Sequence, residues 1–119
     1  MSGILVVDDS AYTRKMIIDS MATAEFKDIF EAASGEEALM QFKEHKPDLV
    51  LLDIILIGMD GMSVLSKIRE INPRAKVIVV TAIGQDAYVK EAEALGIEAY
   101  ITKPFSPKVL VAKIKEILT

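Results

Sequence analysis

The sequence contains no cysteine. This absence excludes disulfide bonds and metal sites with thiolate ligands. No apolar run is long enough to span a bilayer either, because the longest stretch, near residues 49–57, is interrupted by Asp53. The N-terminus lacks the basic segment and the long apolar core of a secretory signal. Together these absences favour a cytosolic protein.

A strong excess of either charge is also missing. The formal net charge is −4 and the isoelectric point is about 5.0, so electrostatics gives no reason to expect nucleic acid or an anionic membrane as a direct partner. What the sequence does contain is 51% hydrophobic and 27% charged residues, a composition typical of folded globular proteins. We expect one domain over residues 1–119, with no output domain.

Five apolar runs have the length and composition of β-strands. They are Ile4–Val7, Asp28–Ala32, Leu49–Asp53, Val77–Thr81 and Glu98–Thr102. Four are rich in Val, Ile and Leu, as expected of strands buried on both faces, whereas the run at 28–32 is weaker. The segments between them carry apolar residues at helical spacing, such as Met62, Leu65 and Ile68, or Leu110, Ile114 and Ile117. This alternation predicts an α/β fold with a parallel sheet covered by helices on both faces.

Local signals mark the ends of the predicted helices. Ser34 followed by Glu37 is typical of a capping box at a helix N-terminus. Ser106 before Pro107 predicts a second N-terminus, with serine as the N-cap and proline at the first helical position. Gly96 is expected where a helix ends.

Reactive side chains follow four of the five predicted strands. The first strand leads into Asp8 and Asp9, the third ends in Asp53, the fourth ends in Thr81, and the fifth leads into Lys103. In an open parallel α/β sheet, sites form beyond the carboxyl ends of the strands. One polar residue at a strand end is ordinary, but four strands that place such groups at one edge indicate a site.

Three carboxylates brought together repel one another. At about 4 Å and an effective dielectric constant near 20, each like-charged pair costs on the order of 4 kcal/mol. Oxygen ligands without histidine or cysteine suit Mg²⁺ or Mn²⁺ rather than zinc. A hard cation, Lys103 and a hydroxyl around a carboxylate could hold a phosphoryl group, and an aspartate can itself accept that group as an acyl phosphate.

Four motifs carry a family resemblance. The runs "VVDDS", "LLDIILIGMDG", "VVTA" and "ITKPF" stand in the order and spacing of a two-component response regulator receiver domain, which the whole chain resembles. The stretch "GQDAYVKEAEALGIEAYITKPF" is similar to the stand-alone, CheY-like chemotaxis type. The resemblance implies a flavodoxin-like, doubly wound sheet of five strands in the order 2-1-3-4-5, flanked by five helices. It also implies a cis bond before the proline of "ITKPF".

The resemblance assigns a phosphoacceptor and a metal site. Asp53 would accept a phosphoryl group from a phosphohistidine on a sensor histidine kinase. Mg²⁺, or alternatively Mn²⁺, would be bound by Asp9, Asp53 and the backbone carbonyl of Ile55, with Asp8 acting through water. On this basis the chain is a signalling domain rather than a turnover enzyme.

The resemblance also assigns a switch and an output surface. Thr81 and Lys103 would contact the phosphoryl oxygens, and Tyr100 would change its rotamer together with Thr81. A downstream partner, either a motor or an adaptor protein, would dock on the surface built around residues 86–118. Candidate contacts on that surface are Tyr100, Lys108 and Lys113.

Two features depart from the family pattern or tune it. Receivers usually carry proline four residues after the acceptor, where this chain has Ile57 followed by Gly58, so we expect a looser loop. In the family, the side chains two positions beyond the acceptor and two beyond the threonine border the route of the water that attacks the phosphoryl group, and here both are apolar, Ile55 and Ile83. A water molecule needs polar partners to be held in line, which predicts slow spontaneous dephosphorylation and a possible need for a separate phosphatase.

Each site residue also has an ordinary structural explanation. Asp8 could be part of a strand-end turn, Asp9 could be a helix N-cap, and Thr81 could be a common β-former. Lys103 could be a solvated charge and Tyr100 a half-buried strand aromatic. Their combination favours the site over these separate explanations.

Other polar residues are expected to carry no chemistry. His45, the only histidine, is expected to be exposed and without a role. Asp60 and Gly61 are expected to form a turn into the next helix.

Alternative functions remain open from sequence alone. The chain could be a receiver excised from a DNA-binding regulator, or a phosphorelay intermediate. From another class, a small aspartyl-phosphate phosphatase is the strongest rival, although such enzymes usually carry an Asp-x-Asp pattern on the first strand and a cap domain.

Overall fold

Five strands and five helices alternate along the described residues, which are 3–22, 26 and 28–119 of this computed structural model. The strands are β1 (Gly3–Val7), β2 (Asp28–Ala32), β3 (Leu49–Leu52), β4 (Lys76–Thr81) and β5 (Ala99–Thr102). The helices are α1 (Ala11–Ser20), α2 (Gly35–His45), α3 (Gly61–Ile71), α4 (Asp86–Ala94) and α5 (Pro107–Leu118). Each predicted strand boundary therefore lies within one residue of the observed one. In the described part of the chain, no helix has the length and apolar character needed to cross a membrane.

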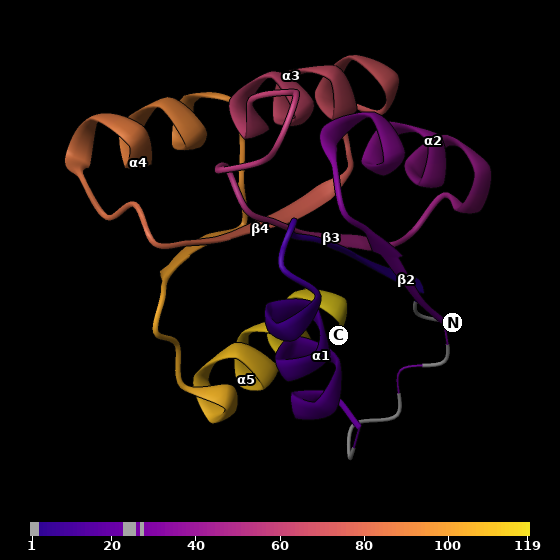
Figure 1. The fold of residues 1–119 in the computed structure, drawn as a ribbon, viewed down its shortest axis with the longest axis vertical. Coiled ribbons are helices and arrows are strands. Elements are labelled where there is room, and N and C mark those ends of the chain that lie inside the picture. Colours follow the sequence, from indigo (N-terminus) through magenta and orange to yellow (C-terminus); the bar gives the residue numbers. More distant parts are fainter. Residues whose placement is uncertain (1–2, 23–25, 27) are drawn as a thin grey trace.

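The strands form one parallel sheet in the order β2-β1-β3-β4-β5. Helices α2, α3 and α4 cover one face of the sheet, and α1 and α5 cover the other (Figure 1). Parallel neighbours need crossover connections, which the helices provide. The predicted doubly wound, flavodoxin-like fold is confirmed.

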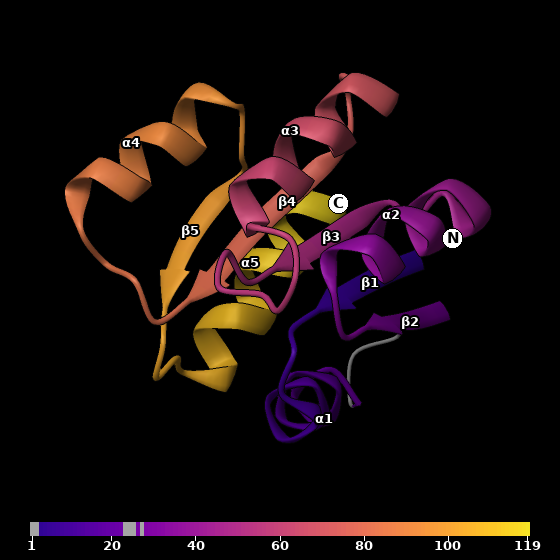
Figure 2. The same cartoon turned by 45° about the horizontal axis from the view of Figure 1, so that its top comes forward.

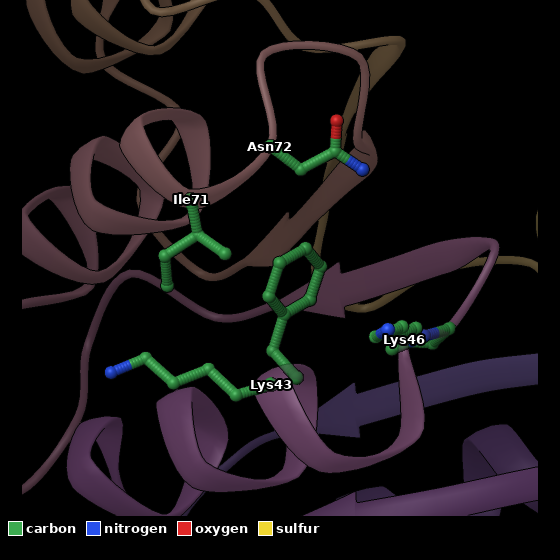
Figure 3. Close-up of a pocket in the computed structure, with 6 residues that line it drawn as sticks. Lys43, Lys46, Ile71 and Asn72 are labelled. Carbon is green, nitrogen blue, oxygen red and sulfur yellow. The ribbon is translucent and has the colours of Figure 1, made fainter.

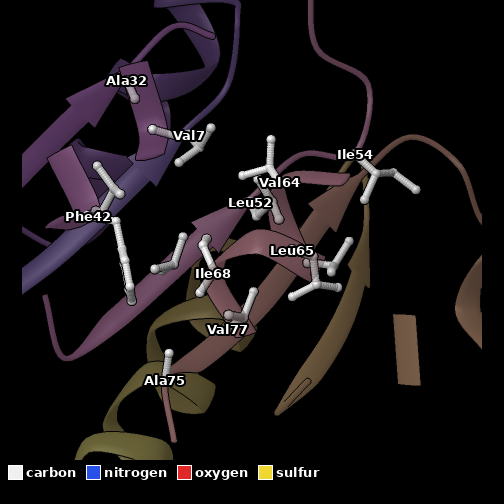
Figure 4. Close-up of a cluster of buried hydrophobic side chains, with 14 of the residues drawn as sticks. Val7, Ala32, Phe42, Leu52, Ile54, Val64, Leu65, Ile68, Ala75 and Val77 are labelled. Atoms are coloured by element: carbon white, nitrogen blue, oxygen red, sulfur yellow. The ribbon is translucent and has the colours of Figure 1, made fainter. Parts of the chain in front are cut away.

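The sheet separates two hydrophobic cores. In β1, the side chains of Leu5 and Val7 point into the core under α2 and α3, while Ile4 and Val6 point into the core over α1 and α5. This alternation follows from the two-residue period of a strand, and it explains why the run is apolar at consecutive positions. Figure 4 shows part of the first core, in which Val7, Leu52, Leu65, Ile68 and Val77 pack together.

The edge strands are less buried than the central ones. The weak apolar character of β2 was predicted, and that strand is only partly buried. The expectation that 98–102 would be buried on both faces was wrong, because Ala99, Tyr100 and Ile101 are half-buried and Thr102 is exposed. As an edge strand, β5 has a hydrogen-bonded neighbour on one side only.

The predicted helix ends are largely confirmed. The Ser34 and Ser106 side chains cap the N-termini of α2 and α5, and Gly96 adopts φ +84° just after α4 ends. The capping box at α2 is incomplete, because the Glu37 carboxylate accepts from the backbone N–H of Ala33 at 2.6 Å rather than from Ser34. The signals therefore located the helix ends correctly but missed one hydrogen-bond partner.

Candidate functional site at the carboxyl edge of the sheet

The carboxyl ends of the strands meet at one edge of the molecule. Figure 2 shows β3, β4 and β5 ending at this edge, close to where β1 leads into α1. Val7 of β1 pairs with Leu52 of β3, so the next residues, Asp8 and Asp53, lie on adjacent strands at the same height. The backbone N–H of Asp53 donates to the carbonyl of Val7 at 3.0 Å, which extends the ladder to the site itself. The register of the sheet therefore brings the two carboxylates together.

A lysine bridges these two carboxylates. The Nζ atom of Lys103 lies 2.7 Å from Oδ2 of Asp8 and 2.8 Å from Oδ2 of Asp53. Asp8 is 2% exposed and Asp53 is 5% exposed, so bulk water solvates neither carboxylate well. Lys103 follows β5 directly, and the peptide bond between Lys103 and Pro104 is cis. Asp53 and Asp8, which lie 50 and 95 residues before Lys103 in the sequence, thus share its ammonium group.

The second oxygen of Asp53 accepts two further hydrogen bonds. The Thr81 hydroxyl donates to Oδ1 at 2.8 Å, and the backbone N–H of Ile55 donates to the same oxygen at 2.9 Å. Thr81 is fully buried at the end of β4. The Asp53 carboxylate is thereby held by a cation on one oxygen and by two neutral donors on the other, which fixes its orientation.

In the turn after β1, the Asp8 side chain is held by a hydrogen bond, whereas the Asp9 side chain is exposed. Oδ1 of Asp8 accepts from the backbone N–H of Ser10 at 2.9 Å. Asp9 does not cap the first helix, because Ser10 is the N-cap of α1 and accepts from the N–H of Thr13. The structure thus places Asp8, Asp53, Thr81 and Lys103 in direct contact, with Asp9 beside them on the surface of the turn.

The charge states follow from burial and from the lysine. Burial raises the pKa of the Asp8 carboxyl, and the hydrogen bond and charge of Lys103 only partly offset this. For Lys103, burial acts to lower the pKa, but its bonds to Asp53 and Asp8 outweigh burial and leave the pKa raised. An ammonium that keeps its proton is therefore the resident counter-charge of the site.

The donor set of the site suits a hard divalent cation. Asp8 and Asp53 share one ammonium, and the exposed Asp9 follows in the same turn, so the acidic residues here outnumber the lysine by two and leave charge for a cation to balance. The donors are all oxygens, as Mg²⁺ prefers. Within the described ranges, no three His, Cys, Asp or Glu side chains are arranged to hold a metal by themselves. Backbone carbonyl and water ligands would have to complete the shell, which is usual for Mg²⁺.

Tyr100 and Thr81 meet at the loop after β4. The Tyr100 hydroxyl donates to the backbone carbonyl of Ile83, and the N–H of Ile83 points to the Thr81 hydroxyl at a long 3.5 Å. Burial raises the pKa of Tyr100, with the negative charge of Asp53 as a smaller cause. The Ile83 peptide therefore lies between the site and the half-buried tyrosine of β5.

The loop between β3 and α3 contains a close backbone approach that the sequence did not reveal. A Cβ on Gly61 would lie 2.2 Å from Cα of Ile54 and 2.7 Å from the carbonyl oxygen of Asp53. The Gly61 N–H also donates to the Ile54 carbonyl at 3.1 Å. Asp60 caps α3, as the predicted turn requires, and Gly58 adopts φ +87°. The glycine of the Asp60–Gly61 pair thus helps to set the position of the segment that carries Asp53.

The predicted output residues belong to the last strand and the last helix. Tyr100 is half-buried, Lys108 is exposed, and Lys113 pairs with Glu116 at 2.8 Å. They lie on β5 and α5, and Val109 adds an apolar side chain that is 57% exposed.

A cavity of about 310 Å³ lies at the amino ends of the strands, opposite the candidate site (Figure 3). Its lining residues are Phe42, Lys43, Lys46, Pro47, Ile71 and Asn72. Lysines at the end of α2 offset the negative end of the helix dipole, which accounts for them without a ligand. His45 is exposed as predicted, but it is not idle, because its ring stacks on Phe30 with centroids 3.9 Å apart.

The fold and the site together define a flavodoxin-like α/β domain with an acidic, lysine-bridged site beyond the strand ends. Residues 4–115 match the response regulator receiver domain. The chain therefore belongs to this family, and it is a CheY-like receiver domain of the two-component response regulators.

Individual relatives support this membership. The chemotaxis protein CheY of Thermotoga maritima is 40% identical over 114 residues, which cover 96% of this chain and 95% of that protein. The CheY of Bacillus subtilis is 41% identical over 102 residues, covering 86% and 85%. The crystal structure of the CheX-CheY-BeF3-Mg+2 complex from Borrelia burgdorferi matches with a TM-score of 0.93 at 33% identity, over 99% of this chain and 90% of that chain.

Proposed function

We propose that the chain accepts a phosphoryl group on Asp53 in a magnesium-dependent reaction. The observation that carries the proposal is the environment of this carboxylate, which contacts the Lys103 ammonium on one oxygen and the Thr81 hydroxyl on the other. Phosphoryl transfer is catalysed mainly by positioning and by charge neutralisation. An aspartate held between a cation and a hydroxyl has both.

The donor would be a phosphohistidine of a sensor histidine kinase. The bond from phosphorus to the donor nitrogen breaks as a bond forms to an Asp53 oxygen, and the product is an acyl phosphate. Thr81 and Lys103, which now bind the carboxylate, would turn to the phosphoryl oxygens. The chain would therefore be a reactant that is modified, not an enzyme that turns over a substrate.

Magnesium would be held by Asp9, Asp53 and the carbonyl of Ile55, with Asp8 acting through water. The bound ion supplies positive charge next to the incoming phosphoryl group. Its two charges match the surplus of carboxylates over ammonium groups at the site, and Mn²⁺ would satisfy the same donors. The presence of Mg+2 in the related Borrelia complex supports this choice.

The output would be a change on the surface formed by α4, β5 and α5. If the Thr81 hydroxyl moves to the phosphoryl group, its long contact with the N–H of Ile83 changes, and the Tyr100 hydroxyl is bonded to the carbonyl of the same residue. Phosphorylation would shift an existing equilibrium at this surface rather than create a new fold. Similarity to chemotaxis CheY proteins supports a stand-alone role in motility, with a motor or adaptor protein as partner.

The proposal is tested by incubating the protein with Mg²⁺ and acetyl phosphate and recording its intact mass. We expect the mass of one phosphoryl group to be added in the wild type, and none without Mg²⁺ or in Asp53→Asn. Asp19→Asn is the matched control, because this exposed carboxylate pairs with Lys15 across one helical turn and lies outside the proposed site. Labelling of Asp53→Asn would overturn the assignment of the acceptor. Steady release of product from a phosphomonoester would favour the phosphatase alternative instead.

A further inference from the structure

Arg14 contacts the backbone of the turn that carries Asp8 and Asp9. Its Nη1 atom donates to the backbone carbonyl of Asp8 at 2.6 Å, and its Nε atom donates to Glu31 Oε1 at 2.9 Å. Glu31 belongs to β2, so the guanidinium links α1, the turn after β1 and the neighbouring strand. The Arg14 side chain is only 15% exposed, and a planar fork bonded at two points has little freedom to move.

The carbonyl that Arg14 binds belongs to the peptide unit between Asp8 and Asp9. The N–H side of Asp8 is already bonded to Ala32, and its carboxylate is bonded to Ser10 and Lys103. Because a peptide is planar, holding its carbonyl oxygen also fixes the direction in which the following residue leaves. Asp9 is exposed, and in the described part of the chain its carboxylate takes part in none of the salt bridges. The direction in which the Asp9 side chain leaves the turn is therefore set by the backbone.

We infer that Arg14 is a positioning residue for the cation site, which aims the Asp9 carboxylate by holding the peptide between Asp8 and Asp9. This inference rests on the proposed magnesium site. Groups behind the ligands of a metal commonly change its affinity by about tenfold to a hundredfold when they are removed. Arg14 would act through Asp8 and Asp9 without touching the ion.

Positioning and simple charge have opposite effects here. Arg14 carries a positive charge close to the acid pair, so as a charge alone it would repel Mg²⁺, and its removal would tighten binding. As a positioning residue it improves the alignment of the ligands, and its removal would weaken binding. The sign of the change in affinity therefore separates the two roles.

The experiment measures the dissociation constant of Mg²⁺ alone, by isothermal titration calorimetry, in the wild type, Arg14→Gln, Arg14→Lys and Lys15→Gln. Lys15→Gln is the matched control, because it removes one positive charge from the neighbouring position of α1, where Lys15 pairs with Asp19 at 3.2 Å. We expect Arg14→Gln to bind Mg²⁺ about tenfold more weakly and Lys15→Gln to bind it at least as tightly as the wild type. Arg14→Lys keeps the charge but not the fork, so it should remain weaker than the wild type.

Equal or tighter binding by Arg14→Gln would overturn the inference while leaving the magnesium site in place. Failure of the wild type itself to bind Mg²⁺ would overturn the proposed function, and the inference with it. If Arg14→Gln only destabilised the fold, circular dichroism would show a lower unfolding midpoint, but the Mg²⁺ affinity of the folded protein would stay unchanged. That result would also overturn the inference. If Arg14→Gln does not fold, Arg14→Lys decides, because it keeps the positive charge but loses the guanidinium fork; Mg²⁺ binding by this variant as tight as in the wild type would then overturn the inference.

Discussion

Replacing Lys103 with glutamine should destabilise the protein because two buried carboxylates would lose their shared counter-charge. Both Oδ2 atoms contact the same Nζ, at 2.7 and 2.8 Å, so they lie at most about 5.5 Å apart, the sum of these two distances. At this separation and an effective dielectric constant near 20, two unit charges repel by about 3 kcal/mol. The wild type offsets this repulsion by the attraction of the ammonium for both carboxylates, and removing one partner of a buried ion pair costs about 3–5 kcal/mol. We therefore expect Lys103→Gln to lower the free energy of unfolding by about 3 kcal/mol at pH 7.

The pH dependence of this effect has a defined sign. The pKa of Lys103 is raised in the fold, so its stabilisation is complete below the ordinary value of 10.5 and is lost as the pH rises through the raised pKa. The pKa of Asp8 is also raised, so acidification protonates this carboxylate early and removes the repulsion. The difference between wild type and Lys103→Gln should therefore be largest near neutral pH and smaller on both sides.

Urea denaturation followed by circular dichroism measures this difference, with Lys113→Gln as the control. Lys113 forms an exposed pair with Glu116, and such pairs contribute about 0–1 kcal/mol. A ligand that binds only the folded state adds stability. In Lys103→Gln, the Mg²⁺ ion is no longer repelled by the lysine ammonium, so Mg²⁺ should stabilise this variant more than the wild type. If Lys103→Gln were as stable as the wild type without Mg²⁺, the electrostatic account of the site would be refuted.

Three further predictions concern the loop after β3, the lifetime of the phosphorylated state and the output surface. Gly61→Ala should lower the free energy of unfolding in urea by about 3 kcal/mol or more, because its Cβ would overlap the backbone of the preceding loop. Gly58→Ala, where space is open but φ is +87°, should lower it by only about 1 kcal/mol. Equal losses of stability in the two variants would contradict this. Replacing Ile55 with Asn and Ile83 with Glu together should speed loss of the phosphoryl group in a time course of intact mass, since polar groups can hold the attacking water; unchanged or slower loss would remove the argument. Tyr100→Ala should abolish phosphorylation-dependent binding of a partner in a pull-down, and undiminished binding would count against the proposed surface.

The strand ends are the part of the site that local sequence could reveal. A buried parallel strand is an apolar run, so a carboxylate, hydroxyl or ammonium at its carboxyl end stands out. Asp8, Asp53, Thr81 and Lys103 were all found in this way, and the structure brings these four together. The same reasoning assigned Asp9 to the site or to a helix cap, and the adjacent Ser10 proved to be the cap.

The residues that sequence analysis missed make contacts with parts of the chain that are distant in sequence or in another element. Sequence analysis did not single out Arg14, because nothing local indicates that its guanidinium reaches the carbonyl of Asp8 and the side chain of Glu31. Gly61 was interpreted as part of a turn, and only the packing of α3 against the loop after β3 shows that a side chain has no room there.

The sequence by itself determined the order of strands and helices, the edge of the sheet where the polar groups gather, and the chemistry of those groups. Apolar periodicity and helix caps act over a few residues, so they can be recognised without coordinates. Only the tertiary structure decided which oxygen of Asp53 meets Lys103 and which meets Thr81, that Lys103 joins Asp8 to Asp53, and that Arg14 supports the turn behind them. These contacts join residues up to 95 positions apart, and their geometry is set by the register of the sheet and the packing of the helices, which no local pattern of residues contains.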